Sequence, residues 1–106
     1  MKTKDKVWIK ASFEIKLAYE ENTKIIEDGR IYRCFGVNMS SRHREIYHIP
    51  SKSLFGVYQM KLQQIKEMID DLMQLNVNWD SSDLTYFQSL DKEIGQQINK
   101  IRLRLR

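Results

Sequence analysis

The side chains best suited to acid–base, metal or nucleophilic chemistry are two histidines and one cysteine. His43 and His48 lack the i,i+4 helical spacing of a metal-binding pair, and Glu45 is the one carboxylate close to them in the sequence. Cys34 falls in an expected strand, where His48 across the sheet is a candidate base for its thiolate. A buried, inert thiol and a histidine at a strand end are the commoner outcomes. We therefore expect no catalytic residue, no metal ligand and no cofactor.

Carboxylates and glycines give no stronger signal for catalysis. Asp70 and Asp71, with Glu67 one helical turn before them, fit a solvated helix face better than a carboxylate site. The four glycines are isolated, so they form no phosphate-binding loop. We expect that the protein is not an enzyme.

Nucleic-acid binding is the alternative function that the sequence supports. Aromatic and basic residues interleave on neighbouring expected strands, as in a base-stacking platform, and a basic tail follows them. The nucleic-acid-binding candidates are Tyr32, Arg33, Arg42, Arg44, Tyr47, Lys100, Arg102, Arg104 and Arg106. Against this alternative, the stretch from Glu67 to Glu93 has seven acidic residues against the single Lys92, and would repel phosphates over much of the surface.

Docking onto another protein is the leading hypothesis. The first helical stripe is rich in methionine, which adapts to shared surfaces, and tryptophan and arginine are common anchors of interfaces. Trp8 lies on the polar side of the first strand and Trp79 lies between two expected helices, although each can instead cover the protein's own core. The partner-binding candidates are Trp8, Arg33, Arg42, Arg44, Tyr47 and Trp79. A homodimer through the helices is a further expectation.

The elements that must position these residues begin with a strand. Apolar residues occupy every second position from Val7 to Tyr19, which predicts a strand with one buried face. We favour the strand from Val7 to Leu17. A helix over residues 13–28 is an alternative. For residues 19–28 the pattern is compatible with strand, turn or helix.

An Asp-Gly pair predicts the next turn. Asp28 and Gly29 separate two apolar runs, as in a type I′ hairpin, in which both central residues have positive φ. A strand then runs from Arg30 to about Val37 or Met39, and Gly36 within it indicates a bulge or a close backbone contact. A fourth strand is expected over residues 44–49, ending at Pro50.

The sequence after Pro50 has the period of helices. A first amphipathic stripe runs from Leu54 to Leu75, with Ser51 or Ser53 as the N-cap. Cap-type residues over 80–83 begin a second helix, whose stripe ends at Leu105. Two helices joined by a short connection predict an αα-hairpin. The expected fold is α+β: an antiparallel β-meander of three or four strands followed by a C-terminal αα-hairpin.

Size and composition suit one domain. The chain has 106 residues, 42% of them hydrophobic and 30% charged, with a net charge of +4. We expect a single domain, 1–106, with a sheet half (6–50) and a two-helix half (51–106). The single cysteine suits a reducing cytosol, and no apolar run is long enough for a signal peptide or a membrane span.

In organisation the chain is similar in kind to small accessory proteins of phages and mobile elements, although no motif carries this likeness. It implies a phage or mobile-element protein that modulates or inhibits a larger host complex, either nucleic-acid-processing or part of a defence system, by steric docking. Such anti-defence inhibitors work by occupying a surface of their target.

Overall fold

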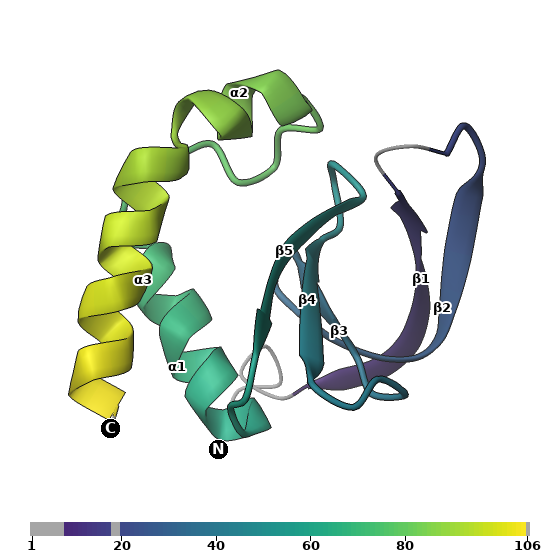
Figure 1. Cartoon of the computed structure of the whole chain (residues 1–106), viewed down its shortest axis with the longest axis horizontal. Helices are drawn as coiled ribbons and strands as arrows, with labels where there is room; N and C mark the ends of the chain where they lie inside the picture. Colours follow the sequence, from purple (N-terminus) through teal and green to yellow (C-terminus); the bar gives the residue numbers. More distant parts are fainter. Residues whose placement is uncertain (1–7, 18–19, 106) are drawn as a thin grey trace, which may run out of the picture. The chain divides into compact units, whose positions relative to one another are not determined.

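The computed structural model describes residues 8–17 and 20–105 (Figure 1). The chain divides into two compact units, Met1–Gln59 and Met60–Arg106. The first unit holds the strands and the second holds the helices. Val7, the first residue of the expected strand, and Ala18, Tyr19 and Arg106 lie outside the described residues.

The first unit is an antiparallel meander of five strands, each paired with the next along the chain. The strands are β1 (Ile9–Lys16), β2 (Thr23–Tyr32), β3 (Phe35–Asn38), β4 (Arg44–His48) and β5 (Ser53–Tyr58). The long ribbon of β1 and β2 is strongly curved in Figure 1. The predicted class, a meander followed by helices, is confirmed. The sheet has one strand more than predicted, and the alternative helix over residues 13–28 is wrong.

The hairpin predicted at Asp28 and Gly29 is wrong, because β2 continues through both residues. None of the described glycines has a positive φ. Gly29 is instead required by a close approach, since a Cβ atom there would lie 2.5 Å from the carbonyl oxygen of Ala11 and 2.7 Å from the Phe13 ring. β2 also has one extra residue between Gly29 and Ile26, which makes a β-bulge opposite the Ala11–Phe13 segment.

The strand expected from Arg30 to Met39 is in fact two strands, because the chain turns at Arg33 and Cys34. Arg33 has a φ of 56° and so adopts the left-handed conformation that the turn requires. The carbonyl oxygen of Cys34 accepts a hydrogen bond from the backbone N–H of Ile49 at 2.9 Å, which ties this turn to the end of β4. Neither residue is a typical turn former, so local composition does not mark this turn.

β5 corrects the predicted start of the first helix. Leu54 and Tyr58 lie in this strand, so the expected boundary at Pro50 is too early. Neither Ser51 nor Ser53 caps a helix; their hydroxyl oxygens lie 2.6 Å apart in the turn between β4 and β5. The first helix begins at Leu62, where the side-chain oxygen of Gln64 accepts from the backbone N–H of Lys61 at 3.0 Å.

Strand pairing divides the sheet into two faces. We name the first the Phe13 face; its buried cluster consists of Phe13, Ile15, Ile26 and Tyr47. The second, the Phe35 face, carries Tyr32, Phe35 and His48, which pair directly across β2, β3 and β4. These three residues are at most 3% exposed. Both faces are therefore buried near the centre of the sheet.

The second unit contains α1 (Leu62–Leu72), α2 (Leu84–Ser89) and α3 (Asp91–Leu105). α1 and α3 pack against each other and form the predicted helix pair. Buried residues recur on both at helical spacing: Ile65, Met68, Ile69 and Leu72 on α1, and Ile94, Ile98 and Ile101 on α3.

The predicted cap of the second helix is confirmed, since the carboxylate of Asp83 accepts from the backbone N–H of Thr85 at 3.0 Å. The second predicted helix is interrupted at Leu90. None of the helices in the described part of the chain is long and apolar enough to cross a membrane.

Candidate functional site

Two predicted partner-binding residues, Trp8 and Arg33, meet at one aromatic ring. The ring of Tyr32 lies 5.5 Å from the Trp8 ring, and the guanidinium carbon of Arg33 lies 5.4 Å from the Tyr32 ring centre. Tyr32 is 2% exposed, Trp8 is partly buried and Arg33 is exposed. We call these three residues the Trp8–Arg33 cluster. A buried ring thus supports two side chains that reach the surface.

The cluster is held by local geometry. Arg33 lies in the tight turn between β2 and β3, where few backbone conformations are available, and its guanidinium is attracted to the ring face of Tyr32. The Trp8 indole N–H is buried and has no hydrogen-bond acceptor among the described residues. Such an unsatisfied donor costs about 1–3 kcal/mol.

The basic loop lies at the opposite end of the sheet. Arg42 and His43 are exposed in the β3–β4 loop, and Arg44 begins β4. β3 runs from the Trp8–Arg33 cluster to this loop, a separation of about 10 Å at the rise of an extended strand. Arg44 is partly buried, and its Nε atom has no partner among the described residues. The structure therefore brings Trp8 and Arg33 together, but not with Arg42 or Arg44.

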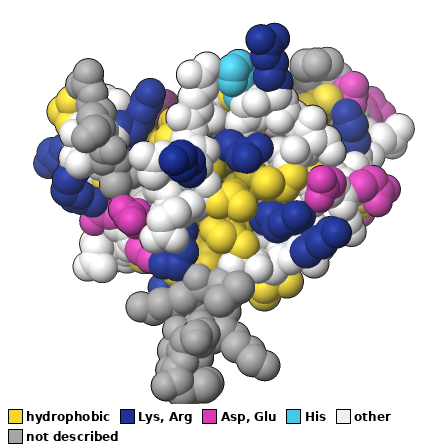
Figure 2. Space-filling view, turned by 90° about the horizontal axis from the view of Figure 1, so that it is seen from below, with side chains coloured by type: hydrophobic (Ala, Val, Ile, Leu, Met, Phe, Trp, Pro, Cys, Tyr) yellow, Lys and Arg dark blue, Asp and Glu magenta, His cyan; other side chains and the backbone are white. Residues whose placement is uncertain are grey.

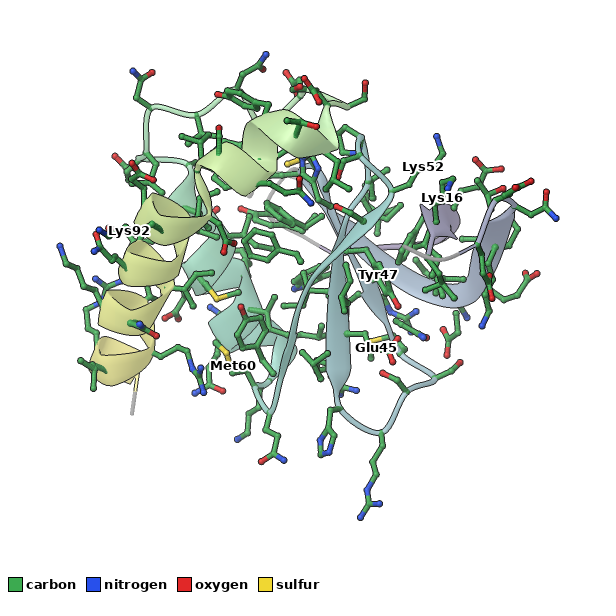
Figure 3. All side chains as sticks on the ribbon, turned by 45° about the horizontal axis from the view of Figure 1, so that its top comes forward. Lys16, Glu45, Tyr47, Lys52, Met60 and Lys92 are labelled. Atoms are coloured by element: carbon green, nitrogen blue, oxygen red, sulfur yellow. The ribbon has the colours of Figure 1, made fainter. Side chains whose placement is uncertain are left out.

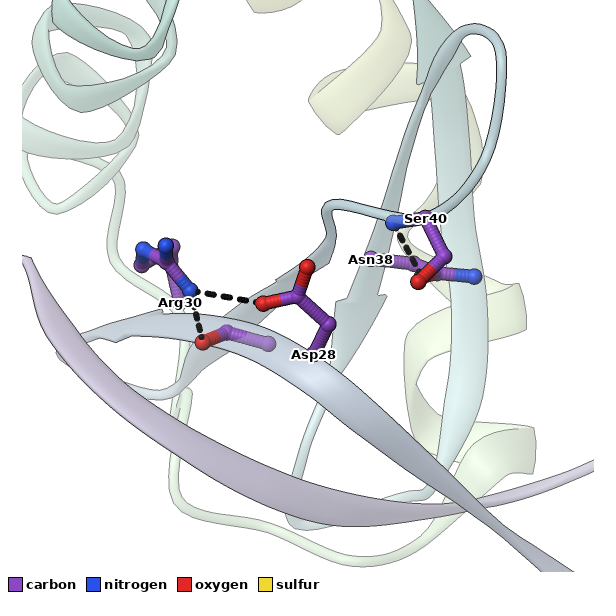
Figure 4. Close-up of polar contacts among 5 residues, drawn as sticks. Asp28, Arg30, Asn38 and Ser40 are labelled. Atoms are coloured by element: carbon purple, nitrogen blue, oxygen red, sulfur yellow. Dashed lines mark hydrogen bonds and ion pairs between the residues drawn. The ribbon is translucent and has the colours of Figure 1, made fainter.

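Short polar contacts shape the chain near this loop. The guanidinium of Arg30 donates to the carboxylate of Asp28 and to the carbonyl oxygen of Gly29, both at 3.0 Å (Figure 4). The side-chain oxygen of Asn38 accepts from the backbone N–H of Ser40 at 3.0 Å, which fixes the start of the loop. These contacts are local, since each joins residues no more than two positions apart in the sequence.

Tyr47 lies on the Phe13 face and is 6% exposed. Its hydroxyl donates to Oε1 of Glu45 at 3.0 Å, and the side chain of Asn38 donates to the same oxygen at 3.0 Å (Figure 3 labels Glu45 and Tyr47). Burial raises the pKa of Tyr47 to about 12, and its hydrogen bond to Glu45 and the charge of that carboxylate act in the same direction. Tyr47 is therefore neutral at physiological pH.

The two tyrosines of the expected stacking platform do not share a surface. Tyr32 pairs with Phe35 on the Phe35 face, whereas Tyr47 pairs with Gly36 and belongs to the Phe13 cluster. Both rings are buried. Bases stack on exposed rings, so neither tyrosine in this conformation offers a stacking surface.

The basic residues near the C-terminus differ in their surroundings: some are exposed, and one forms an ion pair. Lys100 and Arg102 are exposed on α3. A guanidinium nitrogen of Arg104 lies 2.9 Å from Oδ2 of Asp71, which also accepts from Gln97 at 3.4 Å. Arg106 lies outside the described residues. One of the predicted phosphate contacts, Arg104, is thus already paired with a carboxylate.

Trp79 is the second predicted tryptophan anchor. It is 7% exposed, and its ring stacks on Phe87 at 6.0 Å. The hydroxyl of Tyr86 accepts from the backbone N–H of Asn78 at 2.8 Å and holds the same connection in place. Trp79 therefore covers the core of its own unit.

A serine–histidine pair, which the sequence pattern did not predict, lies at the end of β4. Nδ1 of His48 lies 2.8 Å from the hydroxyl oxygen of Ser51, which in turn lies 2.6 Å from that of Ser53. The candidate base for Cys34 is thus hydrogen-bonded to a serine. The three residues lie at the end of β4, in the turn that follows and at the start of β5, and the bond to Ser51 satisfies a histidine that is 3% exposed. The spacing His-x-x-Ser-x-Ser was the available signal, but many turns have it.

Other carboxylates are engaged in local contacts. Lys66 pairs with Asp70 at 3.3 Å one turn away on α1, and Gln63 donates to Glu67 at 3.2 Å. In the part of the chain that the structure describes, no group of three or more His, Cys, Asp or Glu side chains is placed to hold a metal ion.

Hydrophobic side chains also reach the surface, as the face in Figure 2 shows, where they lie among lysines and arginines. The large exposed ones are Ile9, Ile25, Leu54, Val57, Leu84 and Leu103. Leu54 and Val57 are notable because they share the edge strand β5.

Comparisons of the chain with protein-family models, with curated proteins and with solved structures find no match. A functional conclusion must therefore come from the surface itself.

Proposed function

We propose that this protein is a non-enzymatic binding protein that docks onto a larger protein partner through the Trp8–Arg33 cluster. The observation that supports this is the arrangement of Trp8 and Arg33 on the buried ring of Tyr32. Tryptophan and arginine are the residue types most enriched among side chains that dominate binding energy.

The cluster is suited to binding because its side chains are already held in place. An arginine side chain loses about 0.5–1.5 kcal/mol of rotamer entropy when an interface immobilises it. The contact of Arg33 with Tyr32 and the tight turn at Arg33 reduce that loss before the partner arrives.

The proposed mechanism is steric: the partner loses access to the surface that this protein covers. A larger nucleic-acid-processing or defence complex in the cytosol is the target class that we propose, on the basis of the chain's small size and its single cysteine. In this mechanism the protein itself performs no chemistry.

Affinity capture from a lysate of the source cells, with and without nuclease, tests the proposal. We expect one partner to survive nuclease with the unmodified chain and with Arg42→Ala, a control arginine at the other end of the sheet. Arg33→Ala should lose that partner while circular dichroism and the thermal midpoint stay unchanged. Equal retention by all the variants would refute the role of the cluster.

A nucleic-acid function is the second candidate, and the exposure of Lys100 and Arg102 on α3 favours it. If nuclease abolishes the recovery of any partner, Lys100→Gln with Arg102→Gln should weaken nucleic-acid binding and reduce its salt dependence. Binding with an unchanged salt slope would exclude these two residues from phosphate contacts.

A further inference from the structure

Two cations face each other across the ribbon of β1 and β2. Lys10 on β1 pairs directly with Arg30 on β2. Arg30 lies two residues before Tyr32 on the same strand, so both cations belong to the Phe35 face. Directly opposite side chains in an antiparallel pair have Cβ atoms about 4.5–5.5 Å apart, and like charges at this distance are destabilising. The ribbon therefore holds two positive charges together at the expense of its own stability.

This pair is only partly neutralised from within the chain. The carboxylate of Asp28 and the carbonyl oxygen of Gly29 both accept from Nη1 of Arg30 (Figure 4). Nε and Nη2 of Arg30 make no hydrogen bond within the described residues, and the side chain is 26% exposed. Lys10 is exposed, and it forms no ion pair in the part of the chain that the structure describes. One carboxylate thus serves two cations, and the excess charge is open to an anion from outside.

The pair continues into the Trp8–Arg33 cluster. Trp8 lies two residues before Lys10, Tyr32 lies two residues after Arg30, and the two rings are 5.5 Å apart. Two residues of an extended strand span about 7 Å, which is also the distance between successive side chains on one face of an extended peptide. The exposed Arg33, with its guanidinium over the Tyr32 ring, therefore lies about one such step beyond the Lys10–Arg30 pair.

The distribution of charge favours an acidic partner for this surface. The unit Met1–Gln59 has eleven Lys and Arg residues against seven Asp and Glu, whereas the unit Met60–Arg106 has seven of each. The whole net charge of +4 thus lies in the unit that carries the cluster. A patch of one sign attracts a partner surface of the opposite sign and fixes its register.

Of the acidic macromolecules, a peptide segment fits this surface better than a nucleic acid. Tyr32 is 2% exposed, so its ring is covered and cannot stack on a base. Nucleic-acid binders typically neutralise about 6–10 phosphates, and this surface offers three cations beside one carboxylate. A few carboxylates of a protein segment match that number.

We propose that Lys10, Arg30 and Arg33 bind an extended acidic segment of the partner protein, with Asp or Glu at alternate positions. One carboxylate accepts from Lys10 and from the remaining guanidinium N–H groups of Arg30, which relieves the repulsion between them. The next carboxylate on the same side of the segment meets Arg33. This inference rests on the proposed function, because it names the chemistry of the partner that docks at the Trp8–Arg33 cluster.

Fluorescence anisotropy of a short labelled peptide of alternating glutamate and serine, at low salt, tests the site on the full chain. Lys10→Gln should weaken binding about two- to fivefold, the range of one exposed ion pair. Lys24→Gln is the matched control: Lys24 is an exposed lysine of the same ribbon, but it pairs with Ile15 on the Phe13 face. It should bind as the unmodified chain does. Attraction by net charge alone predicts equal losses for the two variants, and that result would overturn the proposal.

Thermal unfolding without peptide provides a second reading of the same two variants. Lys10→Gln removes the repulsion with Arg30 and should have a higher thermal midpoint than Lys24→Gln. A loss of binding by Lys10→Gln then cannot be due to unfolding. A lower midpoint for Lys10→Gln than for Lys24→Gln would show that Lys10 and Arg30 do not repel each other, against the proposal.

Two further results separate this inference from its alternatives. A single-stranded oligonucleotide of the same charge as the peptide should bind more weakly; tighter binding that Lys10→Gln abolishes would assign the site to nucleic acid and overturn the acidic peptide. In the affinity capture, Lys10→Gln should lose the partner that Arg42→Ala retains. Retention of the partner by Lys10→Gln, with its loss by Arg33→Ala, would refute the acidic segment and leave the docking proposal standing. No binding of the peptide to the unmodified chain would also refute the acidic segment.

Discussion

The ring of Phe13 lies against two glycines, and this contact explains both. A Cβ atom at Gly36 would lie 2.6 Å from the Phe13 ring, and one at Gly29 would lie 2.7 Å from it. Both glycines are buried, and Phe13 is 6% exposed. Real Cβ atoms do not approach ring carbons so closely, so any side chain at either position must displace the ring from the core.

We therefore expect Gly36→Ala to lower the free energy of unfolding by about 1–3 kcal/mol, the usual cost of overpacking a core. Gly95→Ala is the control: nothing lies within 4 Å of its added Cβ atom, and Gly95 is inside α3. Alanine is favoured over glycine in a helix by about 0.5–1 kcal/mol, so this variant should be more stable. Urea unfolding measures both. Equal effects of the two substitutions would show that Phe13 moves aside freely.

Tyr47 should make stability depend on pH in the alkaline range. Its pKa is raised from 10.0 to about 12 in the folded chain, so the unfolded chain loses this proton first as the pH rises. The contribution of Tyr47 is complete below pH 10 and is lost between pH 10 and about 12. Urea unfolding across this range should show a steeper fall for the unmodified chain than for Tyr47→Phe. Parallel curves for the two proteins would contradict the raised pKa.

At the scale of elements, the turns are where expectation and structure differ most. Asp28 and Gly29 have the composition of a hairpin turn, yet Gly29 is required by the approach of Ala11 and Phe13. That contact joins β1 to β2, and a local sequence pattern holds no information about it. The actual turn, at Arg33 and Cys34, has no glycine, proline or asparagine that could mark it.

The sequence pattern places β5 at the start of a helix, because Leu54 and Tyr58 continue the apolar stripe of α1 at a spacing of four. In the structure these two residues lie on opposite faces of a strand. Three features were predictable because each depends on a regular local pattern: the period-two run of β1, the interface of α1 and α3, and the cap at Asp83. Of the candidate site, Trp8 and Arg33 were selected by residue type alone, and their shared contact with the ring of Tyr32 depends on strand pairing.

The backbone of Lys52, in the turn between β4 and β5, is strained, and a substitution can relieve this strain. Lys52 has a φ of 58°, a left-handed conformation that costs a non-glycine residue about 1–2 kcal/mol. Glycine removes that cost but adds backbone entropy to the unfolded chain, so Lys52→Gly should gain about 0.5–1 kcal/mol in the free energy of unfolding. The thermal midpoint measures the gain. A lower midpoint would show that the Lys52 side chain contributes more than the strain removes.

At the scale of the whole molecule, the chain consists of two compact units that each carry one tryptophan. Trp8 belongs to the unit Met1–Gln59 and Trp79 to the unit Met60–Arg106. Each unit has buried apolar residues of its own: the Phe13 cluster in the sheet, and the stripes of α1 and α3 in the helices. The two indoles are therefore separate fluorescence probes of the two units.

We expect the units to unfold at different urea concentrations, the helical unit first. It is the shorter of the two, and the fraction of surface that a fold buries decreases with chain length. Fluorescence of Trp8→Phe reports the helical unit through Trp79, and Trp79→Phe reports the sheet unit through Trp8. Helical circular dichroism of the unmodified chain should follow the Trp79 curve, which controls for the effects of the substitutions. Coincidence of all three curves would show instead that the 106 residues unfold as a single cooperative unit.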